Sequence, residues 1–84
     1  MVRLLYFAWV RERIGLDEEV VDPPAEVATI ADLVGWLHGR SAGHAAAFAD
    51  PAQLRAAIDQ RFAPLAAPLA GAREIALFPP VTGG

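Results

Sequence analysis

The sequence of 84 residues contains no cysteine, and this absence removes two kinds of chemistry. Without cysteine the chain has neither disulfide bonds nor a thiolate nucleophile, and its composition fits a reducing compartment. We therefore expect a cytoplasmic protein. A chain of this length forms one domain, near the size at which about 60% of the unfolded surface is buried on folding.

The sequence also lacks long apolar runs and an excess of positive charge. Its apolar opening at residues 4–10 is interrupted by Arg11, Glu12 and Arg13, well short of the roughly 18 apolar residues of a membrane span. Seven basic residues, all arginine, stand against ten acidic ones, giving a net charge of −3. The arginines are scattered and form no basic stripe. We expect neither a membrane nor a nucleic acid as partner.

No pattern typical of an independent active site is present. We recognise no nucleophile–base pair, no metal-ligand cluster and no glycine loop that would cradle a phosphate. The two histidines, His38 and His44, are predicted to make surface or helix-end contacts. The sequence thus predicts no enzyme in isolation, no metal site and no bound cofactor.

What the chain does contain is an unusual carboxyl-terminal stretch. A strand-like run at residues 75–78 is followed by two prolines, which lack amide donors and cannot continue a central strand. Six extended residues span at most about 20 Å, and glycine can pass through a narrow channel. We predict a domain at residues 1–78 and an extended tail at residues 79–84, with the main-chain carboxylate of Gly84 as the reactive group. The tail comprises Pro79, Pro80, Val81, Thr82, Gly83 and Gly84.

The first half of the chain predicts two strands and a helix. Residues 2–10 are apolar in both alternating sets, which indicates a central strand buried on both faces, followed by a turn closed by Gly15. Residues 17–22 predict a second, antiparallel strand. From Thr29, a capping-box pattern and apolar residues at helical spacing predict the main helix, which ends near Gly39.

The second half is less clearly patterned. Residues 45–48 predict a helical turn that anchors Phe48. Local propensity favours a helix at residues 52–62, whereas a complete sheet requires a strand, and we predict a strand at residues 54–58. A loop with a short 3₁₀ turn at residues 63–71 and a last strand at residues 73–78 complete the domain.

Two segments of the sequence are distinctive. These are residues 4–12 (Leu-Leu-Tyr-Phe-Ala-Trp-Val-Arg-Glu) and residues 74–84 (Glu-Ile-Ala-Leu-Phe-Pro-Pro-Val-Thr-Gly-Gly). Both resemble a known family, the small sulfur-carrying subunit of molybdopterin synthase. The resemblance implies an α+β, ubiquitin-like β-grasp fold, with a mixed four- to five-stranded sheet and one main helix packed across it.

The resemblance also implies a function and partners. Gly84 would be adenylated by a ubiquitin-activating-like enzyme that uses ATP, and converted to a thiocarboxylate. The tail would enter a large catalytic subunit, in a heterotetramer, and its sulfur would become part of the dithiolene of molybdopterin. The positions that match the family's apolar docking face are Phe7, Phe62 and Phe78.

The match has two departures, and other functions stay open. Asp59-Gln60 stands where the family commonly has Asn-Gln, and the glycine of a later turn has moved to Gly71. Alternatives are a sulfur carrier for thiamine, cysteine or tRNA thiolation, and a ubiquitin-like module that binds without modification.

Overall fold

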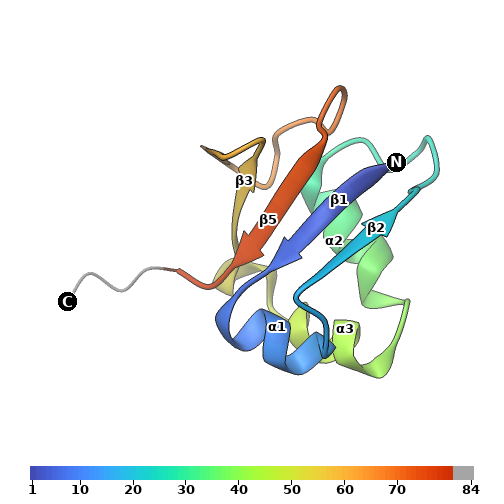
Figure 1. Cartoon of the computed structure of the whole chain (residues 1–84). Helices are drawn as coiled ribbons and strands as arrows, with labels where there is room; N and C mark the ends of the chain where they lie inside the picture. The colour runs from blue at the N-terminus through green and yellow to red at the C-terminus, as the bar shows by residue number, and fades with distance from the viewer. Residues whose placement is uncertain (81–84) are drawn as a thin grey trace.

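The computed structural model describes residues 1–80 and shows a five-stranded mixed sheet with α2 packed across one face and the shorter helices at one end (Figure 1). The strands are β1 (Val2–Tyr6), β2 (Glu18–Val21), β3 (Arg55–Ile58), β4 (Arg61–Ala63) and β5 (Glu74–Phe78). The helices are α1 (Ala8–Ile14), α2 (Ile30–His38), α3 (Ala42–Ala47) and the 3₁₀ helix η1 (Pro51–Gln53).

The strand order β2-β1-β5-β3-β4 places β5 in the middle of the sheet. β1 and β5 are parallel, and the other neighbours are antiparallel. The carboxyl-terminal segment therefore leaves from a central strand, which is held on both sides. This arrangement is the ubiquitin-like β-grasp, and the predicted fold class is confirmed.

The core lies between the inner face of the sheet and α2. Alternate residues of the two parallel strands, Leu4 and Tyr6 in β1 with Ile75 and Leu77 in β5, point inward and are at most 1% exposed. From α2 the apolar residues at helical spacing, Ile30, Leu33, Val34 and Leu37, are at most 2% exposed. Tyr6 and Leu77 are also register partners, so the same packing that forms the core fixes the end of β5.

The predicted main helix is confirmed, with its capping box. The Thr29 hydroxyl accepts the backbone N–H of Asp32 at 3.1 Å, and the Asp32 carboxylate accepts the N–H of Thr29 at 3.2 Å. Hydrogen bonds from the backbone N–H groups of Ala28 and Thr29 lower the pKa of Asp32. Gly39 is the C-cap. No helix within residues 1–80 is long and apolar enough to cross a membrane.

The prediction of one strand over residues 2–10, buried on both faces, is wrong. β1 ends at Tyr6, and Ala8 turns the chain out of the sheet with a φ of 53°. Val10 is then buried on α1, which ends at Gly15 with a φ of 89°. Residues 2–10 are apolar in both alternating sets because they belong to two successive elements, β1 and α1, each of which buries one face. In β1 the outward Arg3 is exposed.

The second half is partly as predicted. β3 confirms the strand at residues 54–58, and Phe48 is buried behind α3. The loop predicted at residues 63–71 begins only after β4, a short edge strand that the sequence analysis missed. The 3₁₀ turn lies at η1, before β3, where Asp50 accepts the N–H of Ala52.

The two departures from the family pattern both lie in left-handed turns. Asp59 and Gln60 have φ values of 48° and 71°. They form a two-residue hairpin turn between β3 and β4, in which positive φ values match the twist of the two strands. The Asp59 carboxylate accepts the backbone N–H groups of Arg73 and Glu74, at 3.1 and 2.9 Å. This turn therefore also fixes the beginning of β5. Gly71, with a φ of 81°, shapes the preceding loop.

Candidate functional site

The end of β5 fixes the place from which the carboxyl-terminal segment starts. On one side Phe78 pairs with Arg55 of β3, and on the other the backbone N–H of Phe7 donates to the carbonyl of Leu77 at 3.3 Å. Pro79 and Pro80 follow and are half-buried. They have no N–H with which to continue the strand. The remaining predicted tail residues, Val81, Thr82, Gly83 and Gly84, lie outside the described residues.

The three predicted docking aromatics lie around this point. Phe62 on β4 is 85% exposed, and its ring centroid is 5.9 Å from that of the half-buried Phe78. Phe7 is 46% exposed and follows Tyr6, the register partner of Leu77. The structure thus brings Phe62 and Phe78 into contact and places Phe7 on the opposite side of β5.

Small residues form a floor between the aromatics on the outer face of the sheet. Strand pairing aligns one outward residue from each strand in a single row: Phe62, Ala57, Ala76, Leu5 and Glu18. Because Ala57 and Ala76 occupy the middle of this row, the surface is low there. We call Phe7, Phe62 and Phe78 together with this alanine floor the aromatic surface.

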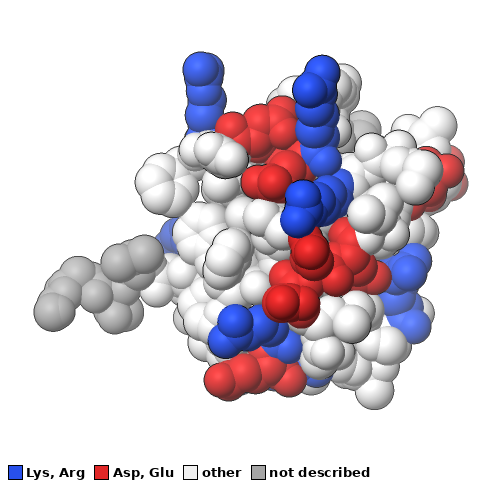
Figure 2. Space-filling model, viewed as in Figure 1, with Lys and Arg blue, Asp and Glu red and all other residues white. Residues whose placement is uncertain are grey.

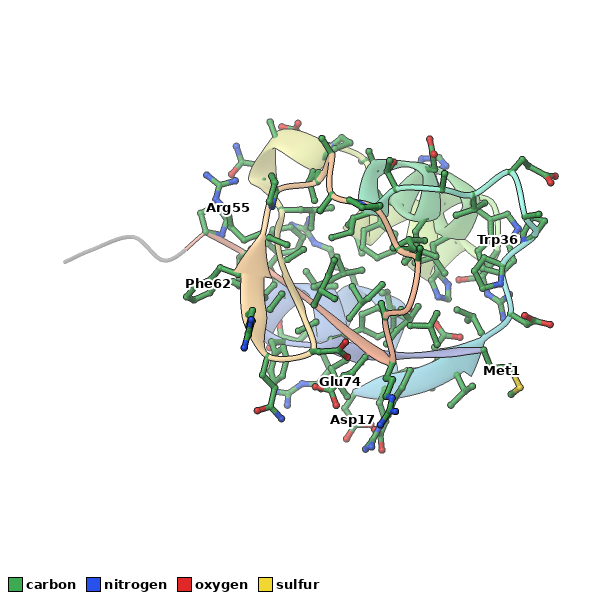
Figure 3. All side chains as sticks on the ribbon, turned by 90° about the horizontal axis from the view of Figure 1, so that it is seen from above. Met1, Asp17, Trp36, Arg55, Phe62 and Glu74 are labelled. Atoms are coloured by element: carbon green, nitrogen blue, oxygen red, sulfur yellow. The ribbon has the colours of Figure 1, made fainter. Side chains whose placement is uncertain are left out.

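A hollow adjoins the aromatic surface on the β3–β4 side. It has a volume of about 470 Å³ and is lined by Arg55, Ala56, Phe62, Ala63, Pro64 and Phe78. Figure 3 shows Arg55 and Phe62 at the end of the molecule from which the carboxyl-terminal segment leaves. In Figure 2 charged side chains of both signs lie over β1, β2 and the upper part of β5, whereas the area over the lower ends of β3 and β5 is largely uncharged. An apolar area thus adjoins the root of the segment.

A buried polar cluster supports this end of the sheet from the inner side. His44 lies in the last turn of α3 but is 5% exposed, so its predicted place at a helix end is confirmed and its predicted surface exposure is wrong; His38 is exposed, as predicted. The Glu19 carboxylate accepts the Tyr6 hydroxyl and Nε2–H of His44, each at 2.7 Å, and His44 Nδ1 contacts the Ser41 hydroxyl at 2.7 Å.

This cluster has clear electrostatic consequences. Burial and the hydrogen bond to Glu19 raise the pKa of Tyr6. Burial alone would raise the pKa of Glu19, but the hydrogen bonds from Tyr6 and His44 prevail and lower it. Every buried polar group of the cluster has a hydrogen-bond partner, and Tyr6 is 1% exposed. We therefore assign the cluster a structural role.

Comparison of the sequence with known proteins identifies the family to which this chain belongs. The sequence profile of the ThiS family matches residues 4–84, and so includes β5 and everything after it. The chain belongs to the ThiS family. Two relatives, each named molybdopterin synthase sulfur carrier subunit, are similar to this chain over their full length. The protein from Escherichia coli (strain K12) is 38% identical and that from Haemophilus influenzae 36%, with 100% of both chains covered in each case.

Solved structures agree with this membership. SAMP1 from Haloferax volcanii superposes with a TM-score of 0.71 at 27% identity, covering 99% of this chain and 98% of that one. A putative molybdopterin converting factor, subunit 1, from Pyrococcus furiosus gives a TM-score of 0.72 at 26% identity, covering 95% and 97%. The resemblance stated from two sequence segments therefore extends over the whole fold of this ThiS-family chain.

Proposed function

We propose that this chain is a sulfur carrier for molybdopterin synthesis, and that Gly84 carries the sulfur as a thiocarboxylate. The observation that carries the proposal is the full-length similarity, at 38% identity, to a molybdopterin synthase sulfur carrier subunit. The ThiS-family match over residues 4–84 supports it.

The proposed chemistry uses only the main-chain carboxyl group. A carboxylate is a poor electrophile, so an adenylyltransferase partner first joins it to the AMP part of ATP, with release of pyrophosphate. A sulfur donor at the oxidation level of hydrosulfide then attacks the Gly84 carbonyl carbon, the bond to AMP breaks and AMP leaves, and loss of the S–H proton to solvent gives C(O)S⁻. No side chain of this chain takes part, and the acids and bases belong to the partners.

The fold suits a carrier of this kind. β5 is held between β1 and β3, so the start of residues 79–84 has a fixed position relative to the aromatic surface. A partner that binds this surface therefore receives the segment from a defined direction. Positioning of this kind replaces a bimolecular search with an intramolecular one. In this proposal residues 1–78 form the delivery domain and residues 79–84 the tail.

We propose that the large catalytic subunit binds the aromatic surface. Phe62 exposes nearly all of its ring in the free chain, next to a hollow of about 470 Å³. Exposed aromatic side chains around a shallow apolar floor are typical of interface centres. Two carriers on a dimeric large subunit would form the expected heterotetramer, and the mass of the purified complex in solution tests this stoichiometry.

The direct test is the intact mass of the chain after co-expression with its adenylyltransferase and a sulfur donor. Exchange of oxygen for sulfur at the terminus should raise the mass by about 16 Da. Deletion of Gly84 should abolish this gain and leave folding unchanged, because a terminal residue contributes little to the core. An unchanged mass, with a partner that modifies a known carrier in the same assay, would refute the proposal.

A carrier for thiamine, cysteine or tRNA thiolation uses the same terminal chemistry with another acceptor. The names of the curated relatives favour molybdopterin. Affinity purification separates the two, since recovery of a thiazole or cysteine synthase in place of a molybdopterin synthase large subunit would move the assignment. For a module that only binds, replacement of Gly83 and Gly84 by bulky residues should leave activity intact, whereas the carrier should lose it.

A further inference from the structure

The strand β2 forms a free edge of the sheet (Figure 1). It pairs with β1 on one side and, within residues 1–80, has no strand on the other. The opposite edge strand, β4, is only three residues long and is followed by Pro64, which has no N–H to pair. β2 is therefore the edge to which another extended chain can add most readily.

The backbone groups that face away from the sheet along β2 belong to Glu18 and Val20. In an antiparallel pair, residues that bond to the neighbouring strand alternate with residues that face away from it. The N–H of Tyr6 donates to the carbonyl of Asp17 at 2.9 Å, so this pair is a bonded one. The N–H of Arg3, the register partner of Val20, donates on the β5 side of β1, which agrees with this alternation. Glu18 and Val20 thus turn their N–H and C=O groups outwards.

The side chains along this edge are acidic, apolar and acidic in turn. Val20 is exposed and stands between Glu18 and Asp22, whose side chains are 46% and 81% exposed. Nε of Arg3 is 2.6 Å from the Glu18 carboxylate, and the Met1 amine is 3.8 Å from that of Asp22. Because each carboxylate has about four acceptor sites and stays exposed, both can take a further cation.

Two copies of this chain do not fit each other along this edge. Antiparallel pairing has to join the outward residues, which leaves three registers. Pairing Glu18 with Glu18 opposes two carboxylates, and pairing Val20 with Val20 opposes Glu18 and Asp22 twice. Pairing Glu18 with Val20 opposes the two Glu19 side chains. Since like charges directly opposite each other destabilise a strand pair, the edge selects a strand of opposite charge.

We propose that the β2 edge binds an extended segment of another protein in which two basic residues flank an apolar one at alternate positions. In antiparallel pairing the segment exchanges hydrogen bonds with the outward groups of Glu18 and Val20. Its basic side chains lie beside Glu18 and Asp22, and its apolar side chain lies beside Val20. The segment lies five strand spacings, about 24 Å, from β4, and so leaves Phe62 uncovered.

A synthetic peptide with blocked ends, Gly-Lys-Thr-Val-Thr-Lys-Gly, tests the inference on the full chain. Its control is the same peptide with glutamate in place of both lysines. Amide NMR signals and amide hydrogen exchange of the isotopically labelled chain are followed as each peptide is added, to about 5 mM.

We expect the basic peptide to slow exchange at two amides of β2 and to leave their neighbours unchanged. With the peptide at about ten times its Kd, the amides of Glu18 and Val20 should exchange about tenfold more slowly, because only the unbound fraction is open. The amides of Glu19 and Val21 already face β1, and they should change little, as should those of β4. The glutamate peptide should slow no amide.

Two matched pairs of variants separate strand pairing from charge. Val20→Pro removes an outward N–H but none that bonds β1, and we expect it to bind about tenfold more weakly than Val20→Thr, which keeps that N–H. The double variant Glu18→Gln with Asp22→Asn should bind about fivefold more weakly than Glu12→Gln with Glu26→Gln, which removes the same charge from exposed positions outside β2. The second pair changes only surface side chains, so it does not depend on the folding of the proline variant.

Three results would overturn the inference. The first is absence of binding by the basic peptide at about 5 mM. The second is equal binding of the basic and glutamate peptides. The third is binding that leaves exchange at Glu18 and Val20 unchanged and is insensitive to Val20→Pro, which would show attraction between charges without strand pairing.

Discussion

Replacing Phe62 by alanine should weaken binding to the large subunit and leave the domain folded. Phe62 is 85% exposed in the free chain. A phenylalanine of this exposure offers roughly 150 Å² for burial, which at about 25 cal/mol per Å² corresponds to about 4 kcal/mol. Alanine retains part of the contact, so we expect a loss of about 2–3 kcal/mol, or roughly 30- to 150-fold in Kd.

Stability should change much less than affinity, because Phe62 is largely exposed in the free chain and packs against the ring of Phe78 on one side only of the sheet's edge strand. We expect the free energy of unfolding to fall by less than about 1 kcal/mol. Calorimetric titration against the purified large subunit measures Kd, and urea unfolding of the same samples measures stability. Val20→Ala is the matched control, since Val20 is 55% exposed on the outer face of β2, away from β5. A folded Phe62→Ala variant that binds no more weakly than Val20→Ala would refute the docking argument.

Three further predictions concern the domain itself. Gly43→Ala should lower the free energy of unfolding by about 1–3 kcal/mol, because the new Cβ would lie 2.6 Å from the carbonyl oxygen of Arg13. Gly35→Ala on α2, where a Cβ would have nothing within 4 Å, should raise it by about 0.5–1 kcal/mol. Urea unfolding of the two variants measures both changes. Gln60→Gly should raise the melting temperature, since a non-glycine residue with a φ of 71° costs about 1 kcal/mol, and a lowered value would contradict the turn. The pKa of Glu19 is lowered from 4.5 in the folded chain, so its contribution to stability is complete above that pH and is lost as the pH falls through the folded pKa. Glu19→Gln should therefore lose stability at pH 7 and show a smaller further loss in acid, and an acid limb of stability against pH identical to that of the wild type would contradict the cluster.

The sequence predicted those elements whose local and long-range preferences agree. α2 combines a capping box at Thr29 with apolar residues at helical spacing, so its position followed from the sequence alone. At residues 54–58 the local and the long-range preferences disagree. Local propensity favoured a helix, but the strand completed the sheet, and β3 now pairs with both β4 and β5. Tertiary pairing outweighs the helix propensity of alanine and arginine there.

The errors lie where two elements share one sequence pattern, or where the signal depends on distant residues. The run at residues 2–10 concealed the change from strand to helix at Ala8, because nothing in its sequence marks an alanine with positive φ. His44 gave no sign of burial, since it lies on α3 and its partner Glu19 lies 25 residues away on β2. The alanine floor was equally hidden, because Ala57 and Ala76 become neighbours only through the register of β3 with β5.

The most direct test of the central claim is a single turnover of sulfur transfer. The chain bearing a thiocarboxylate at Gly84 is mixed with the large subunit and the precursor of molybdopterin, with no adenylyltransferase, ATP or other sulfur source present. We predict that its mass falls by about 16 Da, back to that of the carboxylate, in step with the appearance of the dithiolene product. A dithiolene that forms while the mass of the chain stays constant, or a chain that keeps its sulfur in an active complex, would contradict the claim that the carboxyl terminus is the sulfur donor.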